Sequence, residues 1–145
     1  MSEDQKIKIP TWFWVVGSIA LIWNLLGVMA YLMEVYMSPE AYSQLTTTEQ
    51  NLLNNRPAWA TAAYAIAVFS GAAGCVLLLL KKRWARHAFI LSLVAVIVQM
   101  YHSFFVSNSF DVYGPGAAVM PLLIVLIGVG LIWLSGYANK KSWTA

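Results

Sequence analysis

The 145-residue chain is 60% hydrophobic and only 10% charged, and its formal net charge is +3. With a mean hydropathy of +0.66, this composition excludes an ordinary soluble domain, in which about 25% of residues are charged. The single cysteine, Cys75, excludes an intramolecular disulfide and the four-span thiol oxidoreductases, which need paired cysteines to pass electrons.

Four apolar stretches fill most of the sequence. They cover residues 12–32, 59–80, 84–106 and 117–134. A helix of about 20 residues rises about 30 Å, the thickness of the hydrocarbon core of a bilayer. Because backbone amides find no water there, each stretch is expected to be helical. We therefore predict an all-α membrane protein with a single transmembrane domain, built as an antiparallel four-helix bundle over residues 1–145.

The basic residues are distributed unevenly between the two ends of this predicted bundle. All nine lysines and arginines except Arg56 lie in the N-terminal tail, around the turn between the second and third stretches, or in the C-terminal tail. Short cytoplasmic loops of membrane proteins carry such an excess. The distribution predicts cytoplasmic N- and C-termini. It places the loops after the first and third stretches on the outer side, which is the periplasm in a bacterium.

The loop between the first two stretches carries two helix-start signals. Ser38-Pro39-Glu40 supplies an N-cap, a proline at the first helical position and an acid in the first turn. Thr46, followed by Glu49, matches a capping box. We expect two short periplasmic helices lying on the outer surface. Four apolar side chains of these helices should turn toward the membrane: Tyr42, Leu45, Leu52 and Leu53.

The second stretch is unusually rich in small residues. Ala63, Ala67, Gly71 and Gly74 recur every three to four positions, a spacing that lets helices approach closely in lipid. We predict that this helix is the centre of the bundle. Three interpretations of the stripe are open: tight packing within the chain, a path lined by small residues, or contact with the helices of a homo-oligomer or of a partner membrane protein.

Polar side chains at membrane depth gather on two predicted helix faces. Asn24, Tyr31 and Glu34 share a face of the first stretch, and Gln99 and His102 share one of the third, because helical neighbours are three or four residues apart. Such groups are expensive in a membrane and mark function. We predict a polar cavity in the outer half of the bundle. Its lining is predicted to be Asn24, Tyr31, Glu34, Arg56, Tyr64, Gln99, His102, Ser103 and Asp111.

The same residues also have a structural interpretation. Asn24 and Gln99 would form interhelical hydrogen bonds worth about 0.6–2 kcal/mol, and Glu34 with Arg56 would form an interfacial ion pair of small net value. Within a cavity, Glu34 would instead face His102. Because the reference pKa of histidine is about 6.5, such a pair can hold or pass a proton.

The signals for cofactors are weak. Met29, Met33 and Met37 form one helical stripe, and thioethers are soft ligands suited to Cu(I), but methionine also fills irregular apolar gaps. His87 and His102 lie on one predicted helix, separated by about 22 Å of rise, so one chain cannot supply two axial haem ligands. The sequence has no Gly-rich phosphate loop and no nucleophile–base pattern. We predict no cofactor and no enzymatic activity.

Four strings that span nearly the whole chain carry a family resemblance. They are Ile9-Pro-Thr-Trp-Phe-Trp14, Trp23-Asn-Leu-Leu-Gly-Val-Met-Ala-Tyr31, Val98-Gln-Met100 and Val112-Tyr-Gly-Pro-Gly116. Their order and composition resemble a family of small four-span proteins of the bacterial inner membrane, often labelled "sugar transporter". The resemblance implies transport and a bacterial inner membrane, and it brings no functional residues.

Three functions follow from these features. The first is a small-solute, sugar-like permease or channel, working as an oligomer because four spans rarely enclose a pathway alone. The second is a non-transporting accessory or scaffold protein, whose small-residue faces serve partner helices. The third, less favoured, is a Cu(I)-handling protein. The inner half is short of polar residues, which argues against an open polar pore within one chain.

Cysteine accessibility tests the predicted orientation. In intact cells, a membrane-impermeant maleimide should label Ser43→Cys and leave Ser142→Cys unlabelled until the membrane is permeabilised, because the positive-inside rule places these residues on opposite sides. The unsubstituted chain, with Cys75 alone, is the background control. Labelling of Ser142→Cys in intact cells would contradict the orientation.

Overall fold

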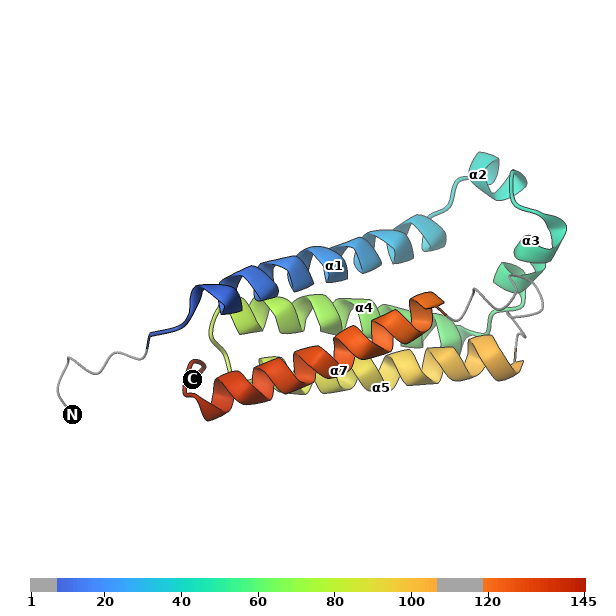
Figure 1. Ribbon diagram of the computed structural model, residues 1–145. Helices are drawn as coiled ribbons and strands as arrows, with labels where there is room; N and C mark the ends of the chain where they lie inside the picture. Colours follow the sequence, from blue (N-terminus) through green and yellow to red (C-terminus); the bar gives the residue numbers. More distant parts are fainter. Residues whose placement is uncertain (1–7, 107–118) are drawn as a thin grey trace.

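The computed structural model describes residues 8–106 and 119–145, and these fold into helices without strands (Figure 1). The long helices are α1 (Thr11–Val35), α4 (Ala58–Leu79), α5 (Ala85–Tyr101) and α7 (Val119–Lys140). A π-helical segment, η1 (His102–Val106), extends α5. Two short helices, α2 (Pro39–Ser43) and α3 (Thr47–Asn54), lie between α1 and α4.

Four helices are long and apolar enough to cross a membrane: Thr11–Val35, Ala58–Leu79, Ala85–Val106 and Val119–Lys140. The predicted all-α, four-helix membrane architecture is thus confirmed. The predicted start of the last span, residue 117, lies outside the described residues. The first and last helices run past the predicted ends at 32 and 134, because backbone hydrogen bonding continues into flanking residues until a helix cap stops it.

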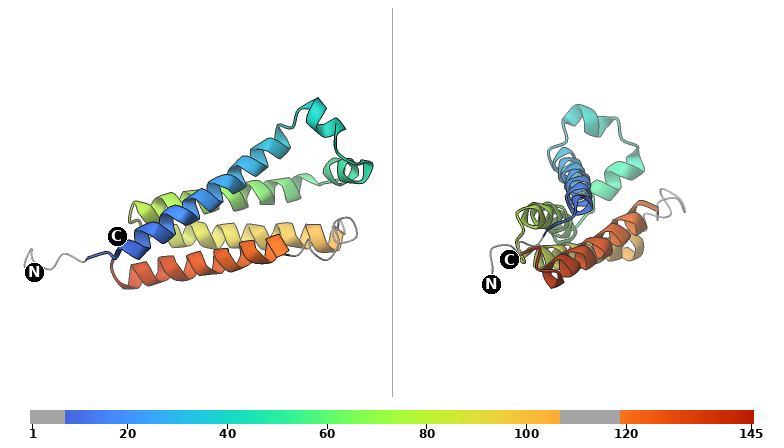
Figure 2. Two further views of the ribbon diagram at one scale, coloured as in Figure 1. Left: turned by 45° about the horizontal axis from the view of Figure 1, so that its top comes forward. Right: turned by 60° about the vertical axis from the view of Figure 1, so that its left-hand side comes forward.

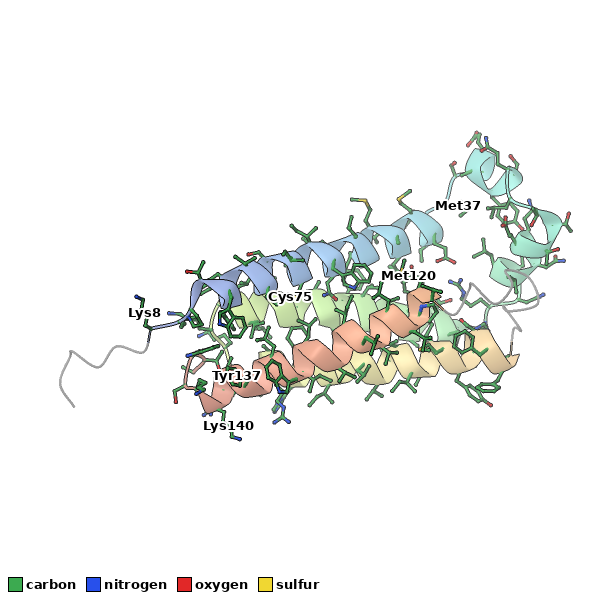
Figure 3. The ribbon with its side chains drawn as sticks, viewed as in Figure 1. Lys8, Met37, Cys75, Met120, Tyr137 and Lys140 are labelled. Atoms are coloured by element: carbon green, nitrogen blue, oxygen red, sulfur yellow. The ribbon has the colours of Figure 1, made fainter. Side chains whose placement is uncertain are left out.

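The long helices form a row in which α1 packs on α4, α4 on α5 and α5 on α7. One end of this row, here called the basic end, carries the start of α1, the α4–α5 turn and the end of α7, with Lys8 and Lys140 (Figures 1 and 3). The opposite end, here called the α2–α3 end, carries the short helices. From the basic end, α1 diverges from the other long helices toward α2 (Figure 2).

Helix α4 lies inside the row between α1 and α5, but it shares the inner position with α5, so it is not the single central helix that was predicted. Ala63, Ala67, Gly71 and Gly74 are all buried within the chain. A Cβ atom at Gly74 would lie 2.6 Å from the ring of Phe89 on α5, and one at Gly71 would collide with Asn24 on α1. The stripe is therefore used for packing inside the monomer. The expectation that it contacts partner helices of an oligomer is wrong for this arrangement, because no part of it remains exposed.

The half of the bundle near the basic end is a packed apolar core. Its buried members are Phe13, Ala20, Cys75, Leu78, Ala85, Phe89, Leu131, Leu134 and Ala138. Aromatic rings close this core at the end of the bundle, where Trp143 lies 5.7 Å from Trp12 and 5.3 Å from Tyr137 between ring centroids. The backbone N–H of Ala145 donates to the carbonyl of Lys81 at 2.8 Å, so the C-terminal segment also holds the α4–α5 turn.

The short helices begin at the predicted caps. The Ser38 hydroxyl accepts from the N–H of Ala41, and Thr46 and Glu49 form a complete capping box. Their apolar side chains are half-buried. Three of them line a cavity and do not face the lipid, because α3 folds back across this end of the bundle. They are Leu45, Leu52 and Leu53.

Alanine substitutions at two glycines test the α4–α5 packing. Gly74→Ala should lower the free energy of unfolding by about 1–3 kcal/mol, because the new methyl meets the Phe89 ring. Gly130→Ala is the matched control, since no atom lies within 4 Å of its Cβ position, and its stability should be unchanged or slightly higher. Both are measured by denaturant titration in micelles. Equal effects of the two substitutions would contradict this packing.

Candidate functional site

A cavity of about 380 Å³ lies at the α2–α3 end and is here called the polar cavity. Helix α3 covers it with two leucines and Glu49, while α1, the segment before α4, the end of α5 and η1 provide the other polar groups. The polar lining residues are Glu34, Glu49, Arg56, Gln99, His102 and Ser103. Five of these six were predicted from the sequence. Glu49 was interpreted only as a capping residue.

An ion pair closes one side of the polar cavity. The Arg56 guanidinium donates to a carboxylate oxygen of Glu34, and both side chains are about one fifth exposed. The guanidinium carbon lies 5.9 Å from the centre of the Tyr64 ring, within reach of a cation–π contact. The pair ties the end of α1 to the segment before α4. The pairing also leaves no net charge on Glu34 and Arg56 together. Separately, the Glu49 carboxylate accepts a hydrogen bond from the backbone N–H of Thr46.

His102 lies in the wall of the polar cavity at the start of η1. Its side chain is buried, and its ring stands edge-on to Trp59 at 5.4 Å between centroids. Within the described residues, no hydrogen bond or ion pair joins His102 to Glu34, because Arg56 occupies the carboxylate. The predicted Glu34–His102 pair is thus not formed directly, although both residues line the cavity. π-Helical turns are rare and frequently occur at functional sites.

A second cavity of about 500 Å³, here called the apolar cavity, lies between the four long helices. Its apolar walls include Trp23 and Leu26 from α1 and Met120 and Ile124 from α7. Five polar side chains also reach it: Asn24, Tyr64, Ser92, Gln99 and Ser103. Gln99 and Ser103 line both cavities, so the two adjoin at these residues.

The polar groups of the apolar cavity differ in their hydrogen bonds. The Asn24 amide donates to the carbonyl of Ala20 at 2.8 Å and to Cys75 Sγ at 3.4 Å. The Ser92 hydroxyl donates to the carbonyl of Ala67 at 2.6 Å. The donors of Asn24 and Ser92 are therefore bonded within the protein. For Asn24, the bond to Ala20 lies within α1, and only the contact with Cys75 is the interhelical bond that the structural interpretation predicted.

Gln99 is different, because its side-chain amide has no hydrogen-bond partner among the described residues. Among the described residues, no buried side-chain N or O atom lacks a hydrogen-bond partner, so the Gln99 amide is open to the cavity space. Gln99 is half-buried and faces both cavities. Water or a bound molecule in these cavities is the natural partner for its donors and acceptor.

The cavities end in the middle of the bundle. A small space of about 40 Å³ continues from the apolar cavity between Asn24, Gly71 and Leu131. Beyond it lies the packed core, with Phe13 and Phe89 fully or almost fully buried. Among the described residues, the site is therefore closed toward the basic end by the packed core.

The other predicted site residues lie elsewhere. Tyr31 packs edge-on against Tyr64 at 5.1 Å and against Phe69 at 5.8 Å, and it lines neither cavity. Asp111 lies outside the described residues. Sequence reasoning missed the contact of Trp59 with His102, because a tryptophan near a predicted interface is also typical of the aromatic belt.

The methionine stripe does not converge on one point. Met29 and Met33 are 56% and 68% exposed on α1, whereas Met37 follows that helix and lines the polar cavity (Figure 3). The described part of the chain also contains no group of three His, Cys, Asp or Glu side chains able to hold a metal ion. A shared Cu(I) site for the three thioethers gains no support from this arrangement.

Comparison of the chain with protein-family models, with curated proteins and with solved structures finds no match in any of the three. The functional argument therefore rests on the geometry of the site.

A double-mutant cycle tests the ion pair at the rim of the polar cavity. Glu34→Gln and Arg56→Gln should each destabilise the protein, and the double variant should lose about 1 kcal/mol less than the sum, because each single change leaves a half-buried charge unpaired. Unfolding in micelles at low and high salt measures this coupling. Glu40→Gln, at an exposed position of α2, is the control. Additive effects would show that the pair contributes nothing.

Proposed function

We propose that this multi-pass membrane protein is a carrier that takes a small, uncharged, hydrogen-bonding solute into its cavities from the outer side of the membrane. The observation that carries this proposal is the pair of adjoining cavities, which reach from the α2–α3 end to the level of Asn24 and stop at a packed core. The excess of basic residues at the opposite end supports an outward-facing α2–α3 end.

The lining favours a neutral solute. Glu34 and Arg56 neutralise each other, and the Glu49 carboxylate is engaged by its own helix start. Toward the membrane interior, the lining includes an amide, an imidazole and a phenol hydroxyl, from Gln99, His102 and Tyr64. Uncharged groups of this kind form hydrogen bonds with the hydroxyls of a solute without burying an unpaired charge. Sugar-like solutes carry such hydroxyls.

Passage to the other side requires more than these cavities. The half near the basic end is filled by the apolar core and closed by Trp12, Tyr137 and Trp143. Transport therefore needs either a conformational change that opens this half or a path between the copies of a homo-oligomer.

The closed half also favours a second candidate function. A protein that binds a solute on one side and passes nothing would act as an accessory or sensor in the membrane, and it needs only the cavities at the α2–α3 end. The two functions share the binding site and differ in flux.

Uptake into proteoliposomes separates these functions. With the full chain reconstituted, uptake of radiolabelled glycerol and glucose should exceed that of empty vesicles and saturate. Gln99→Leu should lower uptake at least tenfold, because the substrate loses its amide partner, which corresponds to about 1.4 kcal/mol. The control Gln44→Leu makes the same change at an exposed position of the short-helix region and should retain uptake.

The same assay tests the role of His102. If the imidazole takes up a proton during transport, uptake by the unsubstituted chain should vary between pH 5 and 8, and His102→Gln should remove this variation while the protein stays folded. Saturable binding without flux would favour the accessory function. Neither binding nor flux of any neutral solute would overturn the proposal.

A further inference from the structure

The apolar cavity has a side that none of the described helices closes. Helices α1 and α7 both line this cavity, but they are not neighbours in the packing order of the long helices. They meet at the basic end, where Trp12 contacts Tyr137. Toward the α2–α3 end, α1 diverges from the rest of the bundle (Figure 2). A gap between α1 and α7 therefore widens along the side of the bundle.

The residues that line this gap are exposed as well as cavity-facing. Leu26 on α1 is 56% exposed and Met120 on α7 is 55% exposed, although both belong to the wall of the apolar cavity. Ala30, one turn beyond Leu26, is also exposed. All three lie in helices that are long and apolar enough to span the membrane. With these helices spanning a bilayer, this side of the cavity faces the hydrocarbon region.

The two cavities together offer one apolar part and one polar part, which match the two parts of an amphiphilic molecule. The walls that face the lipid are aliphatic and aromatic, and the polar cavity adjoins them at Gln99 and Ser103. The unpartnered Gln99 amide lies at this junction, where the polar head of a bound molecule would meet its apolar chain. Because the Arg56 guanidinium is already paired with Glu34, an anionic head would be left without a free counter-charge in the polar cavity.

We propose that the molecule bound here is a neutral single-chain amphiphile with a hydroxyl-bearing head, of the monoacylglycerol type, which enters from the bilayer between α1 and α7. Its acyl chain occupies the apolar cavity, and its hydroxyls bond Gln99 and the polar cavity. This inference rests on the proposed function, since it assigns the class of the solute. The inferred route differs from that of the proposed function, because the molecule enters laterally from the lipid.

Photolabelling tests this assignment. The full chain is placed in phosphatidylcholine nanodiscs with a monoacylglycerol that carries a diazirine in its acyl chain, and labelled peptides are mapped by mass spectrometry. The label should concentrate on Leu26, Ala30, Met120 and Pro121, and excess unlabelled monoacylglycerol should compete it away at least tenfold. Glycerol, which has the head alone, should not compete at the same concentration.

Substitutions in the gap supply the matched comparison. Ala30→Phe should reduce the competed label at least fivefold, because the ring fills the space between α1 and α7. Met29→Phe, at the next residue and equally lipid-exposed but outside this cavity, should keep it. Met120→Phe blocks the gap from the opposite helix, so the test stands even where one variant fails to fold. Gln99→Leu should raise the competing concentration at least tenfold.

Two results would overturn the lateral route. One is a label spread evenly over the lipid-facing residues without competition, and the other is labelling that both blocking variants leave unchanged. If proteoliposomes take up glycerol or glucose while the amphiphile fails to label the gap, the lateral route is wrong and the carrier function stands. If the amphiphile and the soluble solutes all fail to bind, both are wrong.

Discussion

The close approach of α4 to its neighbours is the contact on which the rest of this structure depends. Gly71 accommodates the Asn24 side chain from α1, and Gly74 accommodates the Phe89 ring from α5. Both glycines lie in the part of α4 that leads toward the basic end. In the other direction α4 presents Val68, which meets Gly27, and Tyr64, which meets Tyr31. The two glycines let α1 and α5 approach α4 closely at this level, whereas the Val68 and Tyr64 side chains stand between α4 and α1 further along, where the apolar cavity lies.

Much of this architecture could be predicted because a bilayer restricts the choices. Span lengths, helical conformation and the caps of α2 and α3 follow from the hydrophobic thickness and from residues such as Ser38 and Thr46. The pairing of faces could not be predicted in the same way. A lipid-facing helix is apolar on its outer side as well as its inner side, so α1 shows no pattern that distinguishes its cavity-lining Leu26 from its lipid-facing Met29.

The candidate site could be predicted only in part from its polar residues, for a related reason. Their spacing placed Glu34, Gln99 and His102 on the right faces, since an i, i+3, i+4 pattern determines a face. It did not determine partners. Either Arg56 or His102 could pair with Glu34, and in the structure Arg56 does so. Tyr31 has the same spacing as the cavity residues, yet it packs against Tyr64 and Phe69 at the α1–α4 contact.

The distribution of interactions along the bundle indicates which motions are accessible. At the basic end, opening would break the aromatic contacts of Trp143, the backbone bonds of Ala145 with the α4–α5 turn, and the burial of Phe13 and Phe89. At the α2–α3 end, α1 is held to the start of α4 by the Glu34–Arg56 pair and a few ring contacts. Regions with few buried contacts open at lower free energy. Movement of the end of α1 therefore requires the loss of fewer interactions than the opening of a passage through the core. Under the proposed function, exchange of a ligand between cavity and bilayer would be the easier step, and crossing the basic half would limit transport.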